Sequence, residues 1–164
     1  MKGAALLACA AAVVACNGET AASSLVAATI IRRADTVRFE VPLTVYRCDS
    51  ASDFLLQAVQ SGNGILMWLR PSDSLAGELP ILGVRDTITR PGAVVAIRYY
   101  QESVVHSFAL DSGSVSVVDS GSARRVAVTG SGMEVALGAR QGVVVTIAAL
   151  PEPAESTMSC VPVP

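Results

Sequence analysis

The stretch Thr36-Val-Arg-Phe-Glu-Val-Pro-Leu-Thr-Val45 decides the fold. Its apolar side chains, Val37, Phe39, Val41, Leu43 and Val45, occupy every second position. Strict alternation of β-branched and aromatic residues with polar ones predicts a β-strand with one buried face and one face in water. Pro42 belongs to the solvent-facing set and has no amide donor, so we expect an edge strand or a bulge at this position.

Eight further apolar runs of strand length follow at close spacing. They are residues 65–69, 79–84, 94–101, 104–110, 115–118, 125–129, 133–137 and 143–149. Glycine-containing segments at 111–114, 119–122 and 130–132 are of the kind that tight hairpins require, and we predict turns there. Short strands separated by such turns predict an all-β domain, a single antiparallel β-sandwich or alternatively a small β-barrel.

Two segments have two interpretations each. Residues 53–60 fit a short helix capped by Ser52, but the following Gly62-Asn63-Gly64 favours a hairpin into the strand that contains Trp68. We prefer the hairpin. Residues 25–31 fit either a first strand or an apolar linker.

The N-terminus has the layout of a secretory signal peptide. Lys2 precedes an apolar run from Ala4 to Ala15, which is too short for a permanent transmembrane helix. The end of this run, Val13-Val14-Ala15-Cys16, resembles the bacterial lipobox. The resemblance implies cleavage before Cys16 and lipidation of its sulfur, which would anchor the protein stably in a membrane. An ordinary cleaved signal, with Cys16 in a disulfide, is the alternative.

The expected organisation follows from this motif. Residues 1–15 form the signal peptide, residues 16–35 the lipidated N-terminus and tether, and residues 36–164 the β-sandwich domain. In diderm lipoproteins an aspartate after the lipidated cysteine usually retains the protein at the inner membrane. Asn17 stands at that position here, so the resemblance favours the outer membrane over the inner one.

The domain itself is similar to small β-sandwich modules of uncharacterised secreted bacterial lipoproteins. The similarity covers residues 64–137 and rests on Gly77-Glu-Leu-Pro-Ile-Leu82, Ala96-Ile-Arg-Tyr-Tyr100, Phe108 and Gly113-Ser-Val-Ser-Val117. It brings no catalytic residues with it. It implies a small antiparallel sandwich and nothing further about chemistry.

Composition excludes several classes of function. Without residues 1–15 the chain has 11 arginines, 14 acidic residues and no lysine, since Lys2 is the only lysine. No basic cluster exceeds the pairs 32–33 and 124–125, so binding of nucleic acid is disfavoured. The absence of lysine excludes Schiff-base chemistry in the mature chain.

The cysteines fit an exported protein. With Cys9 removed and Cys16 acylated, Cys48 and Cys160 remain, and two cysteines in an oxidising compartment most simply pair with each other. They lack the close spacing of a zinc site, and we expect no metal and no cofactor.

Few residues could carry chemistry. His106 is the only histidine, and it shares the strand face of Val104, Phe108 and Leu110. We expect a buried, hydrogen-bonded side chain if that face is inward, and an exposed one if the register is opposite. A catalytic role would require a serine and a carboxylate beside it, for which Ser107 and Asp111 are unremarkable candidates.

Two other kinds of site are conceivable. Trp68, Tyr99 and Tyr100 are candidates for an aromatic binding platform, with core packing as the alternative. The Asp-Ser-Gly-Ser segments at 111–114 and 119–122 carry one acid each, which favours turns over calcium loops.

These observations predict a membrane-anchored, non-enzymatic binding or scaffolding domain of the bacterial cell envelope. Its partner, protein or glycan, is not readable from the residues. An envelope hydrolase that uses His106, and a subunit of an envelope assembly, are the alternatives. An exposed apolar strip on one sheet face would favour binding or assembly. A deep pocket holding His106 with a carboxylate would favour the enzyme.

Overall fold

The computed structural model describes residues 24–49, 52–121 and 123–160. The predicted signal peptide, the predicted lipidation site Cys16 and the first part of the predicted tether lie outside these residues. The described chain consists of strands joined by turns. The strands are β1 (Leu25–Ile31), β2 (Thr36–Cys48), β3 (Phe54–Gln60), β4 (Asn63–Arg70), β5 (Gly77–Pro80), β6 (Gly92–Gln101), β7 (Val104–Ala109), β8 (Ser112–Ser120), β9 (Ala123–Glu134), β10 (Ala139–Ile147) and β11 (Thr157–Met158).

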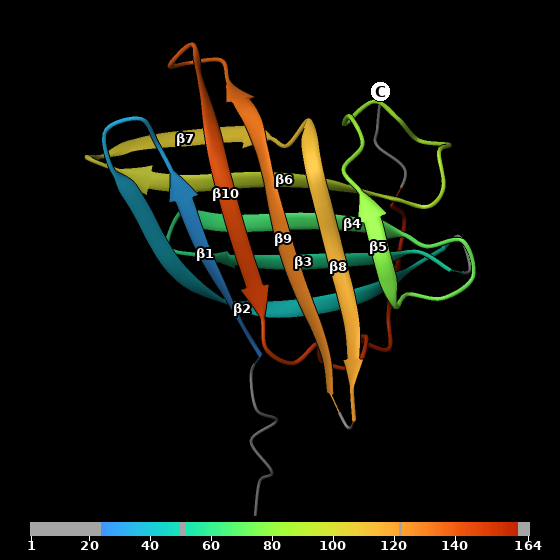
Figure 1. Cartoon of the computed structure of the whole chain (residues 1–164). Helices are drawn as coiled ribbons and strands as arrows, with labels where there is room; N and C mark the ends of the chain where they lie inside the picture. The colour runs from blue at the N-terminus through green and yellow to red at the C-terminus, as the bar shows by residue number, and fades with distance from the viewer. Residues whose placement is uncertain (1–23, 50–51, 122, 161–164) are drawn as a thin grey trace, which may run out of the picture.

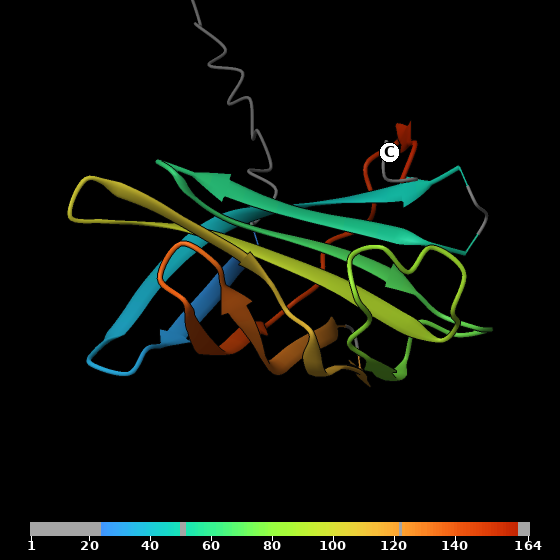
Figure 2. The ribbon, with the colours of Figure 1, turned by 90° about the horizontal axis from the view of Figure 1, so that it is seen from above.

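The predicted all-β antiparallel fold is confirmed. The strands form one curled sheet in the order β5-β8-β9-β10-β1-β2-β3-β4-β6-β7, and β11 pairs with β2. The sheet folds back on itself into two layers whose strands cross steeply (Figure 1). We call β5, β8, β9, β10, β1 and the first half of β2 sheet A, and the second half of β2 with β3, β4, β6, β7 and β11 sheet B. The view from above shows the two layers facing each other across the interior (Figure 2).

The bend between the layers lies within β2 and explains Pro42. β1 pairs with β2 as far as Pro42, and β3 begins to pair at Leu43. The prediction of an edge strand or bulge was therefore wrong, because β2 is an interior strand. Proline is tolerated because Pro42 stands where one neighbour of β2 ends and the next begins, so the missing amide donor interrupts neither ladder.

The core fills the space between the layers. Val41, Leu43 and Val45 of the alternating stretch are buried, and Val37 and Phe39 pack against the same cluster. Burial of such side chains is the main favourable term in folding, at about 25 cal/mol per Å² of apolar surface. The alternation of β2 therefore places its predicted face in the core.

Several boundaries differ from those predicted. The segment 25–31 is a strand between β10 and β2, so the folded part begins before Thr36 and the predicted tether overlaps it. The segment 53–60 contains β3, as the hairpin interpretation required, and the turn at Ser61 and Gly62 has positive φ angles. Residues 81–84 lie outside β5, and the predicted strand 133–137 is the end of β9 followed by a turn.

Two of the three predicted turns are in fact strand. Residues 112–114 belong to β8 and 130–132 to β9. Their glycines permit close approach instead: a Cβ on Gly132 would stand 2.1 Å from the carbonyl oxygen of Ala109, and one on Gly113 2.1 Å from that of Thr129. Glycine is needed where two backbones meet this closely. Gly132 thus lets β9 pass directly against the end of β7.

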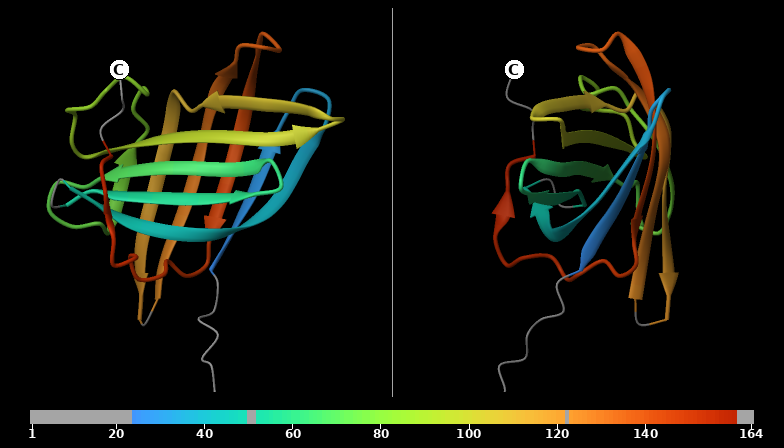
Figure 3. Two further views of the ribbon diagram at one scale, coloured as in Figure 1. Left: turned by 180° about the vertical axis from the view of Figure 1, so that it is seen from behind. Right: turned by 90° about the vertical axis from the view of Figure 1, so that its left-hand side faces the viewer.

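The predicted disulfide is present. Cys48, at the end of β2, is bonded to Cys160, and 112 residues separate the two. The C-terminal segment runs along the ends of the strands of sheet B (Figure 3). Its short strand β11 pairs with Arg47 and Cys48 in parallel. In the part of the chain described, no helix is long and apolar enough to cross a membrane.

Candidate functional site

The outer face of sheet B is apolar where a soluble sheet is usually polar. Cross-strand pairing arranges its outward side chains in rows across the strands, because the side-chain period is two on every strand. One row contains Leu66, Ala96 and Ala109, and a neighbouring row contains Leu55, Trp68 and Val94. Antiparallel sheets with one wet face normally alternate apolar with polar residues, so this face departs from the pattern.

Two adjoining depressions follow these rows. Both include Leu66 and Ala96, and together we call them the apolar trough. The first, the Arg98 half, has a volume of about 410 Å³ and is lined by Val59, Gly64, Ile65, Leu66, Ala96, Ile97, Arg98, Ser107, Phe108 and Ala109. The second, the Trp68 half, has a volume of about 320 Å³ and is lined by Leu55, Leu66, Trp68, Val84, Val94, Ala96, Ser159 and Cys160.

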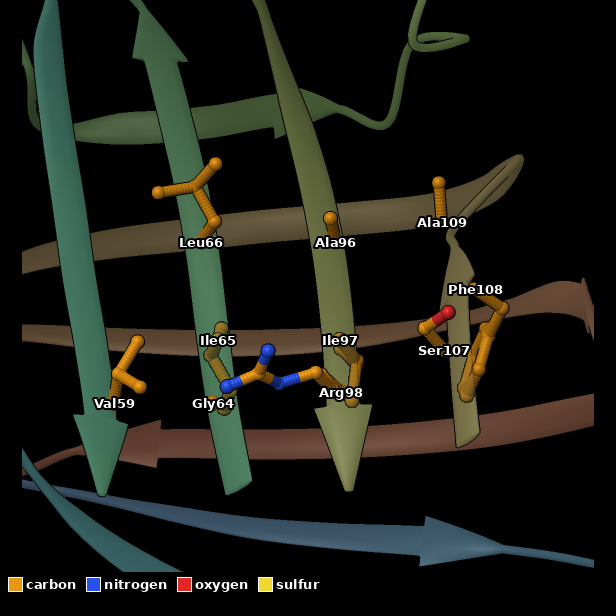
Figure 4. Close-up of a pocket in the computed structure, with 10 residues that line it drawn as sticks. All are labelled: Val59, Gly64, Ile65, Leu66, Ala96, Ile97, Arg98, Ser107, Phe108 and Ala109. Atoms are coloured by element: carbon orange, nitrogen blue, oxygen red, sulfur yellow. The ribbon is translucent and has the colours of Figure 1, made fainter. Parts of the chain in front are cut away.

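The Arg98 half has a floor of small and aliphatic side chains. Figure 4 shows Leu66, Ala96 and Ala109 in one row across β4, β6 and β7, with Arg98 and Ser107 in the next row. Alanine at two of the three floor positions leaves room above the sheet, while Leu66 remains 43% exposed. The hollow therefore results from side-chain size on a regular sheet.

Arg98 supplies the only formal charge in the lining of either half. Its Nε donates a hydrogen bond to the carbonyl oxygen of Gly62 at 3.1 Å, which holds the guanidinium beside the floor. Among the described residues, none forms a hydrogen bond or ion pair with the two terminal nitrogens of Arg98, whose side chain is exposed. The trough thus offers apolar surface with a cation at one end.

In the Trp68 half, a group of polar side chains contacts the indole of Trp68. The indole Nε1 of Trp68 donates to Asp53 at 3.1 Å, and the guanidinium of Arg70 lies 4.6 Å from the indole ring centre. Arg90 also binds Asp53, at 2.5 Å, and the carbonyl of Pro71 at 3.1 Å. These contacts fix the orientation of the indole.

The second notable cluster is buried between the layers, where β7 meets β9. Glu134 is fully buried, and its carboxylate binds three neighbours: the hydroxyl of Tyr99 at 3.0 Å, Nδ1 of His106 at 2.5 Å and Nε2 of Gln141 at 3.1 Å. Tyr99 and His106 are cross-strand partners and stack with ring centres 4.8 Å apart. We call these four residues the Glu134 cluster.

This environment changes the acidity of Tyr99. Burial of the side chain, together with its hydrogen bond to Glu134, raises the pKa of Tyr99 to about 12. The phenolate is disfavoured because it would be buried beside a carboxylate. Tyr99 is therefore a hydrogen-bond donor to Glu134 at neutral pH.

The rim of the cluster is also polar. Arg32 and Asp35, in the turn between β1 and β2, form an ion pair at 3.2 Å, and Gln101 donates to Asp35 at 2.9 Å. These contacts join the β1–β2 turn to the β6–β7 hairpin. Three buried polar atoms at this end have no hydrogen-bond partner among the described residues: Nη1 of Arg32, Oε1 of Gln101 and Oε1 of Gln141.

His106 lies on the inner face and is hydrogen-bonded, which is one of the two arrangements that the sequence left open. The carboxylate beside it belongs to Glu134, which is distant in sequence and was not foreseen. Ser107 points to the outer face, and Asp111 is bound by Arg140. Neither half of the trough has His106 or Glu134 in its lining. In these two depressions, His106 is therefore not brought together with a nucleophile.

The proposed aromatic platform is not formed. Tyr99 is fully buried on the inner face, whereas Trp68 and Tyr100 lie on the outer face in different rows. Among the described residues no cluster could hold a metal ion. Of the three aromatic candidates, only Trp68 contributes to the trough. Sequence reasoning missed Leu66, Ala96 and Arg98 as site residues. The signal for Leu66 was the run from Ile65 to Leu69, which is apolar on both faces.

Comparison with known proteins adds no relative. No protein-family model, no curated protein and no solved structure matches this chain. The function must therefore be inferred from the site itself.

Proposed function

We propose that this protein is a lipid-anchored domain of the bacterial cell envelope, without enzymatic activity, that binds an apolar segment of another envelope protein through the Arg98 half of the trough. The observation that carries the proposal is the exposed apolar row formed by Leu66, Ala96 and Ala109 beside Arg98. A contiguous apolar surface with a polar rim is typical of a protein interaction site.

The chemistry of the trough favours a protein segment over a glycan. A sugar site needs several hydrogen-bonding groups around an aromatic ring, and the Arg98 half has only Arg98 and Ser107 as polar side chains. The cation at the edge adds a requirement for the partner. We infer that the bound segment is apolar and carries an acidic residue placed opposite Arg98.

Anchoring in the envelope is supported by three features. The N-terminal motif that ends in Cys16 resembles a lipobox, and the Cys48–Cys160 disulfide suits an oxidising compartment. In addition, β1 begins at the end of sheet A opposite the β9–β10 hairpin (Figure 1). A tether attached there leaves the trough open to a partner beside the membrane.

Labelling with a radioactive fatty acid tests the anchor. We expect incorporation into the wild-type protein and partition of the mature protein into detergent. The Cys16→Ser variant should be soluble or remain an uncleaved precursor. Absence of label from the wild type would refute the lipid anchor.

Site-specific photo-cross-linking tests the trough. A photoreactive residue in place of Leu66 should cross-link a partner in intact envelopes, and the same residue in place of Val135, exposed in the turn after β9, should not. Adding Arg98→Glu should abolish the product, while Arg33→Glu, an exposed arginine in the turn between β1 and β2, should leave it unchanged. Equal yields with both arginine variants would refute the role of Arg98.

The Glu134 cluster favours one alternative, an envelope hydrolase in which His106 acts as a base. Glu134 orients His106 through Nδ1, and no described residue binds its Nε2. His106→Gln separates the two functions. We expect it to leave cross-linking at Leu66 intact, whereas loss of a hydrolytic activity at unchanged melting temperature would favour the enzyme. If cross-linking at Leu66 yields several different subunits of one complex, the protein is a subunit of an envelope assembly.

A further inference from the structure

The sheet ends at β5 on one side and at β7 on the other, and the two edge strands differ in their protection. β5 has four residues, Gly77–Pro80, and they include a glutamate and a proline. Short length, charge and proline are devices that keep an edge strand from pairing with another chain. β7 has six residues, Val104–Ala109, and contains no acidic residue, no arginine and no proline. Its edge therefore lacks these devices.

The register shows which backbone groups of β7 are available to another strand. In an antiparallel pair, residues that exchange hydrogen bonds with the neighbouring strand alternate with residues whose N–H and C=O groups point away from it. The amide of Leu110, directly after β7, donates to the carbonyl oxygen of Val95 at 2.9 Å. Every second residue before Leu110 therefore bonds β6, and the groups of Val105 and Ser107 point away from β6. In the part of the chain described, β6 is the only strand that pairs with β7 (Figure 1).

This edge borders the Arg98 half of the trough. Ser107 and Ala109 line that depression, and both belong to β7 (Figure 4). At the Ala109 end β9 closes the edge, because a Cβ on Gly132 would stand 2.1 Å from the carbonyl oxygen of Ala109. The remaining part of the edge contains Val105, which is 52% exposed, and Ser107. Unpaired backbone groups and the apolar floor of the trough are thus continuous.

We propose that the partner's segment pairs with β7 as an additional strand of sheet B, through the backbone groups of Val105 and Ser107. This inference rests on the proposed function and specifies how its partner binds. In such strand additions, backbone hydrogen bonds supply affinity and alternate side chains supply specificity. Because β9 closes the edge at Ala109, the segment leaves the edge there and continues over the trough floor. Its apolar residues then cover Ala109, Ala96 and Leu66.

The dimensions and the charge of the trough define the segment further. The floor from β7 across β6 to β4 extends over about 10 Å, a distance that about three extended residues cross. At its far side the guanidinium of Arg98 lies toward Gly64 and bonds the carbonyl of Gly62 through Nε (Figure 4). An acidic residue placed there pairs with the terminal nitrogens of Arg98. The segment thus contains, in sequence, a part that pairs with β7, about three apolar residues and one acidic residue.

A second copy of this chain matches the site less well. Its own β7 has the same unprotected edge, but both ends of that strand continue directly into the fold of the second copy. A turn at Glu102 and Ser103 joins β7 to β6, and Leu110 leads into β8 of sheet A. Neither end is free to continue over the trough floor, so a second copy would leave the floor uncovered. A separate extended segment covers both the edge and the floor.

The fold already accepts proline at an outward position of an edge strand. The amide of Ile81 donates to the carbonyl oxygen of Gly113 on β8 at 3.0 Å. By the same alternation, the nitrogen of Pro80 points away from β8, so its ring interrupts no hydrogen bond. Proline at an outward position of β7 should likewise block an incoming strand and leave the pairing with β6 intact.

Val105→Pro makes this change on β7. We expect it to lower the yield of photo-cross-linking at Leu66 in intact envelopes at least tenfold. The matched control Glu78→Pro, at an outward position of β5, should leave the yield unchanged. Ser107→Pro repeats the test on the same edge in case Val105→Pro lowers the melting temperature. An unchanged yield with either folded β7 variant would overturn the strand addition and leave the proposed function standing.

A second readout maps the segment. A photoreactive residue in place of Val105 should cross-link the same partner peptide as one in place of Leu66. Two residues along β7 to Ser107, two more to Ala109 and about three across the floor place the two attachment sites about seven residues apart, which mass spectrometry measures. A product of two copies of this chain at Val105 would assign the edge to a second copy and overturn the proposal. Absence of any product at Leu66 would instead refute the proposed function and this inference with it.

Discussion

A small β-domain usually buries apolar side chains and exposes polar ones. The Glu134 cluster and the apolar trough both depart from this arrangement, the first by burying polar groups and the second by exposing apolar ones. Inside, at the corner where β7 meets β9, a carboxylate is fully buried with three polar partners. Outside, on sheet B, leucine and alanine occupy positions that face water. Burying the polar groups and exposing the apolar ones both have a cost, yet only the first is compensated within the chain, through hydrogen bonds. The difference indicates that the Glu134 cluster serves the fold, and that the trough serves a contact with something else.

The disulfide should give the largest effect on stability. Reduction, or Cys48→Ser and Cys160→Ser separately, opens a loop with a sequence separation of 112 residues. The chain-entropy model predicts a loss of roughly 4–5 kcal/mol in the free energy of unfolding, with smaller values often measured. The two variants should have the same lowered denaturation midpoint in urea. Because Cys160 also borders the Trp68 half, the variants should alter Trp68 emission before unfolding begins. A midpoint unaffected by reduction would contradict this prediction.

Removing the centre of the buried cluster should come next. Glu134→Ala leaves the polar groups of Tyr99, His106 and Gln141 without their shared acceptor. We expect a loss of about 1–3 kcal/mol for each buried polar group left without a partner. Glu134→Gln keeps the shape and should cost less. Glu78→Gln, an exposed glutamate on β5, is the control and should change unfolding in urea very little. A small effect of Glu134→Ala would mean that water replaces the carboxylate and that the site is more open than the structure indicates.

The pKa of Tyr99 makes the stability contributed by the Glu134 cluster depend on pH. Its value of about 12 in the folded protein lies above the ordinary value of 10.0. The folded state therefore retains the phenolic proton more strongly than the unfolded state. This contribution to stability is complete below pH 10 and is lost as the pH rises toward 12. It amounts to about 2–3 kcal/mol. Tyr99→Phe should remove this alkaline loss, measured by urea unfolding at several pH values. Tyr100→Phe, the exposed neighbour, should not.

The smallest effect is expected on the outer face. Leu66→Ala should change the free energy of unfolding by less than about 0.5 kcal/mol, because the side chain is 43% exposed and supports no core contact. Leu56→Ala is the matched change on the neighbouring strand, at a fully buried position, and should cost about 2–5 kcal/mol. Cross-linking or partner binding should show the reverse order. If Leu66→Ala destabilised the protein as much as Leu56→Ala, the trough would be part of the core and not a docking surface.

Much of the fold follows from sequence alone. The alternation at 36–45 determines which face of β2 is buried, because side chains on a strand point alternately to either side whatever its neighbours are. The pairing of Cys48 with Cys160 was predicted by counting cysteines, once Cys9 is assigned to the predicted signal peptide and Cys16 to the predicted lipidation site. The period of its strand places His106 on the same face as Phe108 and Leu110, although it does not tell whether that face points inward. These features depend only on residues close together in the sequence or on a count of cysteines, so they can be predicted without knowing the three-dimensional packing.

Only the tertiary structure decided the rest. Pro42 marks the bend because the pairing of β2 with β1 stops at this residue and its pairing with β3 starts at Leu43. Gly130 and Gly132 lie in strand because another backbone passes close by. Glu134 reaches His106, 28 positions away, only because β9 crosses the end of β7. Leu66, Ala96 and Ala109 form one row only through the register of three strands. Periodicity tells which side of a strand faces in, but register and crossing determine which residues from distant strands meet, and these depend on the packing of the whole chain.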